Sequence, residues 1–225
     1  LKNVVNPDDV IAEYGADTLR LYEMYMGPLE ASAPWNTNDI VGVHRFLQRV
    51  WRLGVEEETG ELRTCLQDKQ SEEVERALHK TIAKVSGDIP ELAYNTAIAS
   101  MIEFVNTATS EGCITKNQLT TFIKLLSPFA PHITQELFDR LGESDFVCSS
   151  QWPTFDKAML VASNIELPVQ IMGKVRGKIT VPASADSDEI EKVALSDEHI
   201  KDCLCGLTVR KIVVVPGKII NIVAN

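Results

Sequence analysis

The sequence predicts a mainly α-helical protein that ends in a small α+β domain. Between residues 7 and 142, apolar side chains recur at helical spacing in segments separated by glycine, proline and capping residues. From about residue 165 the pattern changes to short, β-branched runs separated by turns. We therefore expect three parts: N-terminal helices in residues 1–38, a helical bundle in 39–160 and an α+β domain in 161–225.

The first of these parts is predicted to be a helix–turn–helix. Asn6 can cap a first helix that begins with Pro7, and Asp8 and Asp9 lie near the positive end of its dipole. Gly15 ends this helix, and Asp17 opens a second one that stops before Gly27 and Pro28. The local signals alone therefore predict a compact helix–turn–helix without catalytic residues.

A helix predicted from about residue 39 to residue 54 carries different residues on its two sides. At about 100° of turn per residue, residues 40, 43, 47 and 50 form an apolar side. Arg45, Arg49 and Arg52 gather within about 60° on the other side. They are either a solvated, helix-favouring surface or a row of forked donors that follows a nucleic-acid backbone.

The rest of the bundle is expected to begin after an acidic, polar loop at residues 55–70. A helix starts near Ser71, and an almost entirely apolar helix at 92–108 is predicted to be central in the bundle. Residues 116–126 form the next helix, and another follows Pro128 and stops at Gly142. Methionine and phenylalanine in the 92–108 helix are predicted to be core residues.

The C-terminal domain is expected to contain two hairpins and two helices. Its elements are strands at 165–172, 175–181, 208–215 and 219–223, with helices at 186–195 and 198–204. Turns are expected at Gly173-Lys174 and at Pro216-Gly217.

Two groups of cations follow these strands. Lys174, Arg176 and Lys178 alternate along one strand, so a period of two places them on one face. The second group, around the second hairpin, consists of Arg210, Lys211 and Lys218. Such cations either bind an anionic partner or protect a sheet edge against pairing.

The composition excludes several other classes of function. The net charge of −10 argues against binding a polyanion over the whole surface and leaves only local basic patches for that purpose. No apolar run is long enough to span a bilayer, and no export signal is present, so we expect a cytoplasmic protein without a membrane partner. Five cysteines without recurring spacing predict reduced thiols and no metal site. No phosphate loop or nucleophile motif occurs, so no catalytic residue is predicted.

Several stretches resemble class I aminoacyl-tRNA synthetases, and most closely the bacterial leucyl-tRNA synthetases. Residues 3–36 resemble the segment that follows the catalytic Lys-Met-Ser-Lys-Ser loop, and residues 45–53 resemble a helix that faces tRNA. Residues 125–142 and 149–156 resemble the anticodon-binding bundle and its Trp-Pro closing turn. The hairpins at 169–182 and 209–223 resemble those of the C-terminal domain, which in this family contacts the outer corner of the tRNA.

This resemblance implies the tRNA-binding C-terminal portion of a leucine–tRNA ligase, with tRNA-Leu as its partner. Residues 1–38 would be stem-contact helices beside catalytic and editing domains that the sequence lacks, so the chain should be inactive by itself. The protein is also expected to be a monomer. ATP and magnesium would serve the full-length enzyme, and this portion would hold no cofactor. The cations named above would contact tRNA, with Arg45, Arg49, Lys174, Arg176 and Lys178 as the foremost candidates.

Two alternatives remain open at this stage. A helical module with a small α+β adaptor could bind proteins and no RNA, which would suit the acidic composition. An isoleucyl or valyl relative is disfavoured by the C-terminal hairpins.

Overall fold

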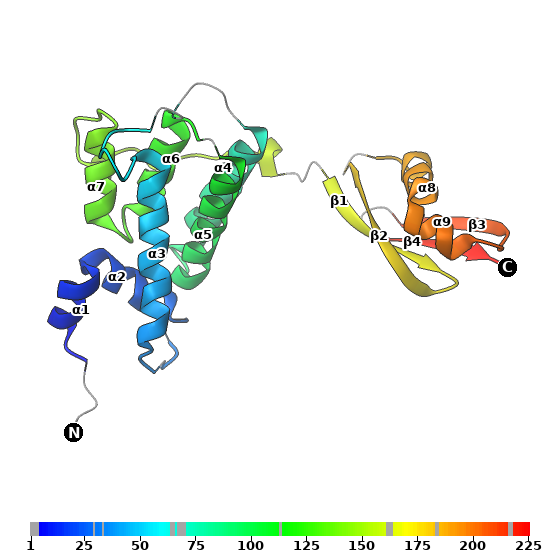
Figure 1. Ribbon diagram of the computed structural model, residues 1–225, viewed down its shortest axis with the longest axis horizontal. Helices are drawn as coiled ribbons and strands as arrows, with labels where there is room; N and C mark the ends of the chain where they lie inside the picture. Colours follow the sequence, from blue (N-terminus) through cyan, green and yellow to red (C-terminus); the bar gives the residue numbers. More distant parts are fainter. Residues whose placement is uncertain are drawn as a thin grey trace. The chain divides into compact units, whose positions relative to one another are not determined.

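The computed structural model describes residues 5–28, 30–32, 34–63, 66, 71–112, 114–160, 164–182, 185–215 and 218–225. These residues belong to two compact units, Leu1–Leu160 and Val161–Asn225 (Figure 1). The division falls where the sequence places the start of the α+β domain. The mainly α-helical fold class with a small α+β domain is confirmed.

The described elements of unit 1 are helices, apart from an isolated β-bridge between Val55 and Leu62. Its elements are α1 (Pro7–Tyr14), α2 (Ala16–Tyr25), α3 (Thr37–Gly54), α4 (Glu72–Asp88), α5 (Tyr94–Glu111), α6 (Lys116–Leu126), α7 (Pro131–Arg140), η1 (Val147–Ser149) and η2 (Lys157–Leu160). Capping residues bound these helices: Asn6 caps the start of α1 as expected, and Gly112 ends α5 in the left-handed conformation with φ 65°. Thr115 and Gln118 form a reciprocal capping box at the start of α6.

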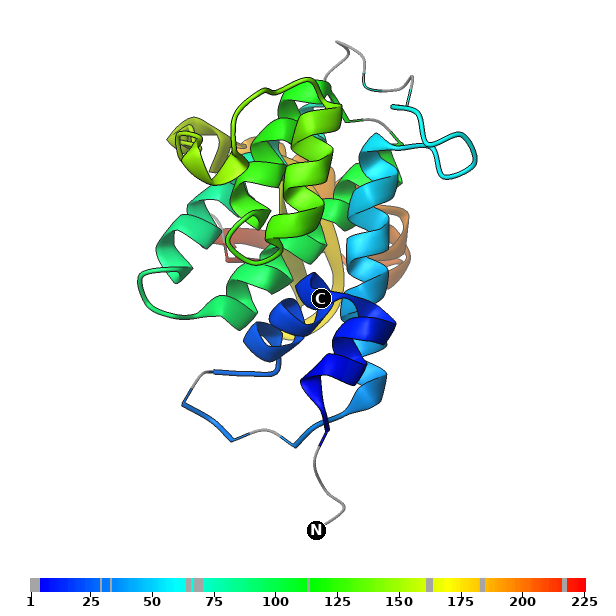
Figure 2. The same ribbon diagram turned by 90° about the vertical axis from the view of Figure 1, so that its left-hand side faces the viewer.

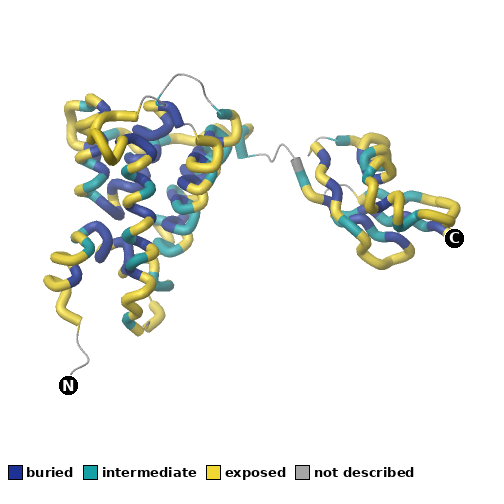
Figure 3. The backbone as a smooth tube through the Cα atoms, in the orientation of Figure 1, coloured by how far each residue is buried: buried dark blue, intermediate teal, exposed yellow. Residues whose placement is uncertain are grey.

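All seven α-helices of unit 1 contribute to one core. Phe104 of α5 and Phe122 of α6 stack at its centre with ring centroids 4.7 Å apart, and both are buried. Leu21 and Tyr22 of α2 belong to the same buried cluster. Figure 3 shows buried stretches along the helices of the bundle, whereas α1 is mostly exposed. Residues 5–38 therefore share a core with the bundle and do not form a separate unit.

Tyr22 fixes the path of the chain from α2 to α3. Its hydroxyl accepts a hydrogen bond from the backbone N–H of Asn36 at 2.8 Å, and its ring packs edge-on against Trp35. The Asn36 side chain then caps α3. Helix α2 packs against α3, and Figure 2, viewed from the side of the N-terminus, shows α1 in front of them. A buried tyrosine therefore sets where the arginine-bearing helix begins.

Unit 2 is a four-stranded sheet with two helices. Its elements are β1 (Asn164–Ile171), β2 (Lys174–Pro182), α8 (Ser187–Ser196), α9 (Glu198–Leu204), β3 (Val209–Val215) and β4 (Ile219–Ala224). The strand order is β2-β1-β4-β3, in which β1 and β4 are parallel and both hairpins are antiparallel. Ile190 of α8 and Ile200 of α9 pack in one buried cluster with Leu167 and Ile220 of the sheet.

The first hairpin turn differs from the prediction by one residue. It consists of Met172 and Gly173, with φ values of 51° and 77°, whereas the sequence placed it at Gly173-Lys174. Two consecutive residues with positive φ are typical of the tight turn that matches strand twist. The turn predicted at Pro216-Gly217 lies outside the described residues.

Candidate nucleic-acid interface

The arginine row of α3 lies on the side of the helix that faces away from the core. Ile40, Val43, Leu47 and Val50 are buried, as the helical period predicts. On the other side Arg45 and Arg52 are exposed and Arg49 is half-buried. The amphipathic pattern of this helix is therefore confirmed, and three guanidiniums are presented along its outer side.

The three arginines differ in how far they are engaged. Arg45 makes no hydrogen bond or ion pair with any residue that the structure describes. Arg49 donates one long hydrogen bond, 3.5 Å, to the Thr109 hydroxyl of α5. Arg52 forms an ion pair with Glu57 at 2.8 Å, and both side chains are about half exposed. Arg45 and Arg49 are thus the members of the row whose guanidinium donors are available to bind an anion.

A cavity of about 420 Å³ lies beside this row and brings in a residue that the sequence analysis missed. Arg63 lines it together with Arg49 and Arg52, and its remaining walls are Leu53, Ala108, Thr109, Gly112 and Ile114. Arg63 lies in the segment at residues 55–70, which was predicted to be an acidic, polar loop. The only available signal was an arginine following four glutamates, at 56, 57, 58 and 61.

In unit 2, the prediction that Lys174, Arg176 and Lys178 share one face is wrong. Lys178 lies opposite Pro168 and Lys174 opposite Ile171, but the register shifts by one residue between these pairs. The extra residue is Arg176, which forms a β-bulge and reverses the alternation. Lys174 therefore lies on the side of buried Ile171, and Lys178 lies on the opposite side. All three side chains are exposed.

The second cationic group of unit 2 contains another bulge. Strand β3 pairs Val209 with Ala224 and Lys211 with Val223, so Arg210 is the extra residue. Its Nε donates to the Asn225 side-chain oxygen at 2.6 Å. Lys211 and Lys218 are exposed and form no ion pair with a described residue.

The corrected register defines one open surface on this sheet. Gly177 faces α9, where a Cβ atom would lie 3.0 Å from Ile200, so its side of the sheet is the covered one. Lys178 and Lys211 project from the opposite side, on the two edge strands, with exposed Val213 and Val215 beside Lys211. Lys178 is paired with Glu166 at 3.3 Å. Edge protection and anion binding are both compatible with this placement.

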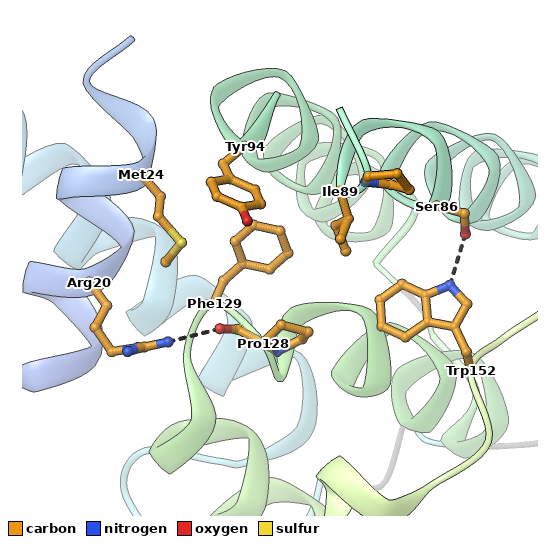
Figure 4. A pocket seen from close by; sticks show the side chains of 9 residues that line it. Arg20, Met24, Ser86, Ile89, Tyr94, Pro128, Phe129 and Trp152 are labelled. Atoms are coloured by element: carbon orange, nitrogen blue, oxygen red, sulfur yellow. Dashed lines mark hydrogen bonds between the residues drawn. The ribbon is translucent and has the colours of Figure 1, made fainter. Parts of the chain in front are cut away.

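A second cavity, of about 440 Å³, is apolar. Figure 4 shows Arg20 and Met24 of α2 on one side of it and Ser86 and Trp152 on the other, with Phe129 between them. The Trp152 indole donates to the Ser86 hydroxyl at 2.8 Å, and Arg20 donates to the Pro128 carbonyl at 3.0 Å. The first bond connects the Trp-Pro segment to α4, and the second connects α2 to the turn between α6 and α7. We therefore assign the cavity a structural role.

The structure also bears on metal sites and membrane segments. Within the described ranges, no group of three or more His, Cys, Asp or Glu residues could hold a metal ion. Cys148, Cys203 and Cys205 are free thiols, whereas Cys65 and Cys113 lie outside those ranges. Among the helices that the structure describes, none has the length and apolarity that a membrane span requires.

More than half of the chain matches a known family. Residues 72–194, more than half of the chain, match the model of the anticodon-binding domain of tRNA ligase. The chain therefore belongs to this family. The match begins at α4 and extends through the first hairpin into α8 of unit 2.

A solved structure shows which kind of tRNA ligase this chain resembles. The chain is similar to the leucyl-tRNA synthetase (LeuRS) in the ternary complex of Agrobacterium radiobacter K84 agnB2 LeuRS, tRNA and LeuAMS. The sequence identity is 29%, the TM-score is 0.75, and the match covers 99% of this chain and 31% of that chain. The resemblance drawn from the sequence is confirmed, and the chain spans about a third of the length of that synthetase.

Proposed function

We propose that this chain is the tRNA-binding C-terminal portion of a leucyl-tRNA synthetase and positions tRNA-Leu for the ATP-dependent attachment of leucine. One observation carries the proposal. A chain that matches a tRNA-bound leucyl-tRNA synthetase along 99% of its length presents a row of arginines on the outer side of α3. The same structural match supports tRNA as the partner.

The proposed contribution to the reaction is positioning. Cations that hold the body of the tRNA restrict where its 3′ end can move, and this makes attack on the activated amino acid effectively intramolecular. Because these contacts lie far from the reacting atoms, they contribute binding energy that orients the reacting end. The chain's own residues would bind and orient tRNA, and none of them would make or break a bond.

The remaining parts of the proposal concern the rest of the synthetase. Helices α1 and α2 would support the catalytic loop as stem-contact helices, and the chain alone would not activate leucine. ATP and magnesium would act in the catalytic portion. We further propose that the protein acts as a monomer in the cytoplasm.

A protein-binding module is the second candidate, and specific observations favour it. The net charge is −10, and two of the candidate cations, Arg52 and Lys178, are paired with carboxylates. An interface with another protein would be mainly apolar and would depend little on salt. Exposed Val213 and Val215 of unit 2 would suit such an interface.

The salt dependence of tRNA binding separates the two candidates. Each phosphate contact contributes a log–log slope of about one, so three contacts weaken binding on the order of 50-fold between about 50 and 200 mM salt. We expect this behaviour when the 225-residue chain is titrated into labelled tRNA-Leu in a filter-binding assay. A non-leucine tRNA, measured in parallel, tests whether the contacts discriminate among tRNAs. A flat response to salt, or no binding, contradicts the proposed function.

A further inference from the structure

The acidic segment after α3 folds into a small hairpin that returns to the end of that helix. Val55 and Leu62 form a β-bridge, and the backbone N–H of Glu56 donates to the Glu61 carbonyl at 2.8 Å. The chain reverses at Gly60, whose φ of 72° suits glycine. The residue that follows the hairpin, Arg63, is thereby placed beside the last turn of α3.

Two hydrogen bonds hold Arg63 in this position. Its backbone N–H donates to the Gly54 carbonyl at 2.9 Å, and its Nη1 donates to the Arg52 carbonyl at 3.1 Å. Cations are favoured at the C-terminal end of a helix, so this contact also caps α3. A guanidinium has five N–H donors in a planar fork, so the cap leaves donors that can face the cavity.

The cavity therefore collects guanidiniums from two different segments. Arg49 and Arg52 come from α3 and Arg63 comes from the end of the hairpin, and apolar Leu53, Ala108 and Ile114 form part of the wall. Planar guanidiniums bind phosphate oxygens in pairs of parallel hydrogen bonds, and partial exclusion of water strengthens such bonds. The chemistry of the lining is that of an anion site.

We propose that this cavity binds a phosphate of the RNA backbone, with Arg63 as the third guanidinium beside Arg49 and Arg52. The inference rests on the proposed function and adds to it a cavity beside the arginine row of α3 and one residue, Arg63, from outside that row. RNA is favoured over an acidic peptide because Arg45 and Arg49 continue the cationic row along α3, with a spacing that suits successive phosphates.

Two carboxylates occupy these arginines in the free chain. Glu57 pairs with Arg52 at 2.8 Å, and Glu56 pairs with Arg63 at 3.4 Å; all four side chains are between 41% and 54% exposed. Ion pairs this exposed are weak, so a phosphate can replace the carboxylates. Glu57 must then move aside while its charge still repels the phosphate. Its removal therefore strengthens binding.

The test is a set of salt titrations of the 225-residue chain with labelled tRNA-Leu. We expect Arg63→Ala to weaken binding about tenfold at low salt and to lower the log–log slope by about one. Glu57→Gln is expected to strengthen binding about threefold, because one repulsive charge is lost. Arg63→Lys should keep the slope and lose part of the affinity, since lysine retains the charge without the fork.

The controls separate this site from a structural role and from the proposed function. Lys80→Ala removes one exposed charge from α4 and should leave the slope unchanged. If Arg63 only capped α3, Arg63→Ala would leave the log–log slope unchanged even where it weakened binding, and that result overturns the site. If binding by the wild type depends on salt but Arg63→Ala has the same affinity and slope as the wild type, the cavity is overturned and the proposed function is not. A wild type that shows no salt dependence overturns the proposed function and the cavity with it.

Discussion

Replacement of Arg45 and Arg49 together by glutamate is expected to weaken binding of tRNA-Leu about 100-fold. A hydrogen bond between charged groups contributes about 1.5–3 kcal/mol, and a reversed charge adds repulsion from the phosphate that was bound. The salt slope should fall by about two, because two phosphate contacts are lost. A filter-binding titration at several salt concentrations measures both quantities.

The fold should survive this double substitution. Arg45 is exposed and contacts none of the described residues through a hydrogen bond or ion pair, and Arg49 contributes one long bond to Thr109. A change in global charge is controlled by Lys80→Glu with Lys157→Glu, two exposed lysines on α4 and η2 whose reversal alters the net charge equally. Equal loss of affinity in both double variants would show that overall charge, and not the α3 row, governs binding.

The elements of this fold could be predicted from the sequence because each depends on local chemistry. The apolar side of α3 follows from helical spacing, and α6 begins where Thr115 and Gln118 form a capping box. The strands of unit 2 lie where β-branched runs alternate with turns. In these segments the residues that decide the structure lie within a few positions of one another.

The candidate site could be predicted only in part because the rest depends on partners that are distant in sequence. Arg176 and Arg210 are bulge residues, and a bulge is a property of two paired strands that one strand's alternation cannot reveal. Arg63 reaches the cavity because Val55 pairs with Leu62 and folds the hairpin back. The pairing of Arg52 with Glu57 depends on the same hairpin.

The stabilising contacts of Asp17 also could not be predicted from the sequence, because its partners lie far away along the chain. The sequence predicts an acid in the first turn of α2, and Asp17 is there. Its carboxylate, however, accepts hydrogen bonds from the N-terminus of α7, at the backbone N–H groups of His132 (3.3 Å) and Ile133 (2.8 Å). It also contacts His132 Nδ1 at 2.8 Å. The α7 N-cap residue, Ala130, supplies no side-chain bond of its own, so Asp17 caps α7 from another helix.

Asp17→Ala is therefore expected to destabilise unit 1 by about 3 kcal/mol. The substitution leaves the N–H groups of His132 and Ile133 without their acceptor at a site where Asp17 itself is only 7% exposed. An unsatisfied buried polar group costs about 1–3 kcal/mol, and loss of a helix cap costs about 1 kcal/mol. Asp17→Asn keeps one acceptor oxygen and should fall between the alanine variant and the wild type.

Urea unfolding followed by tryptophan fluorescence isolates this effect. All three tryptophans, Trp35, Trp51 and Trp152, lie in unit 1, so their signal reports the unfolding of that unit. Asp9→Ala is the matched control, since Asp9 is an exposed acid in the first turn of α1 whose loss should cost about 0.5 kcal/mol. A midpoint for Asp17→Ala that coincides with that of the control would mean that α7 is held in place by its apolar side alone.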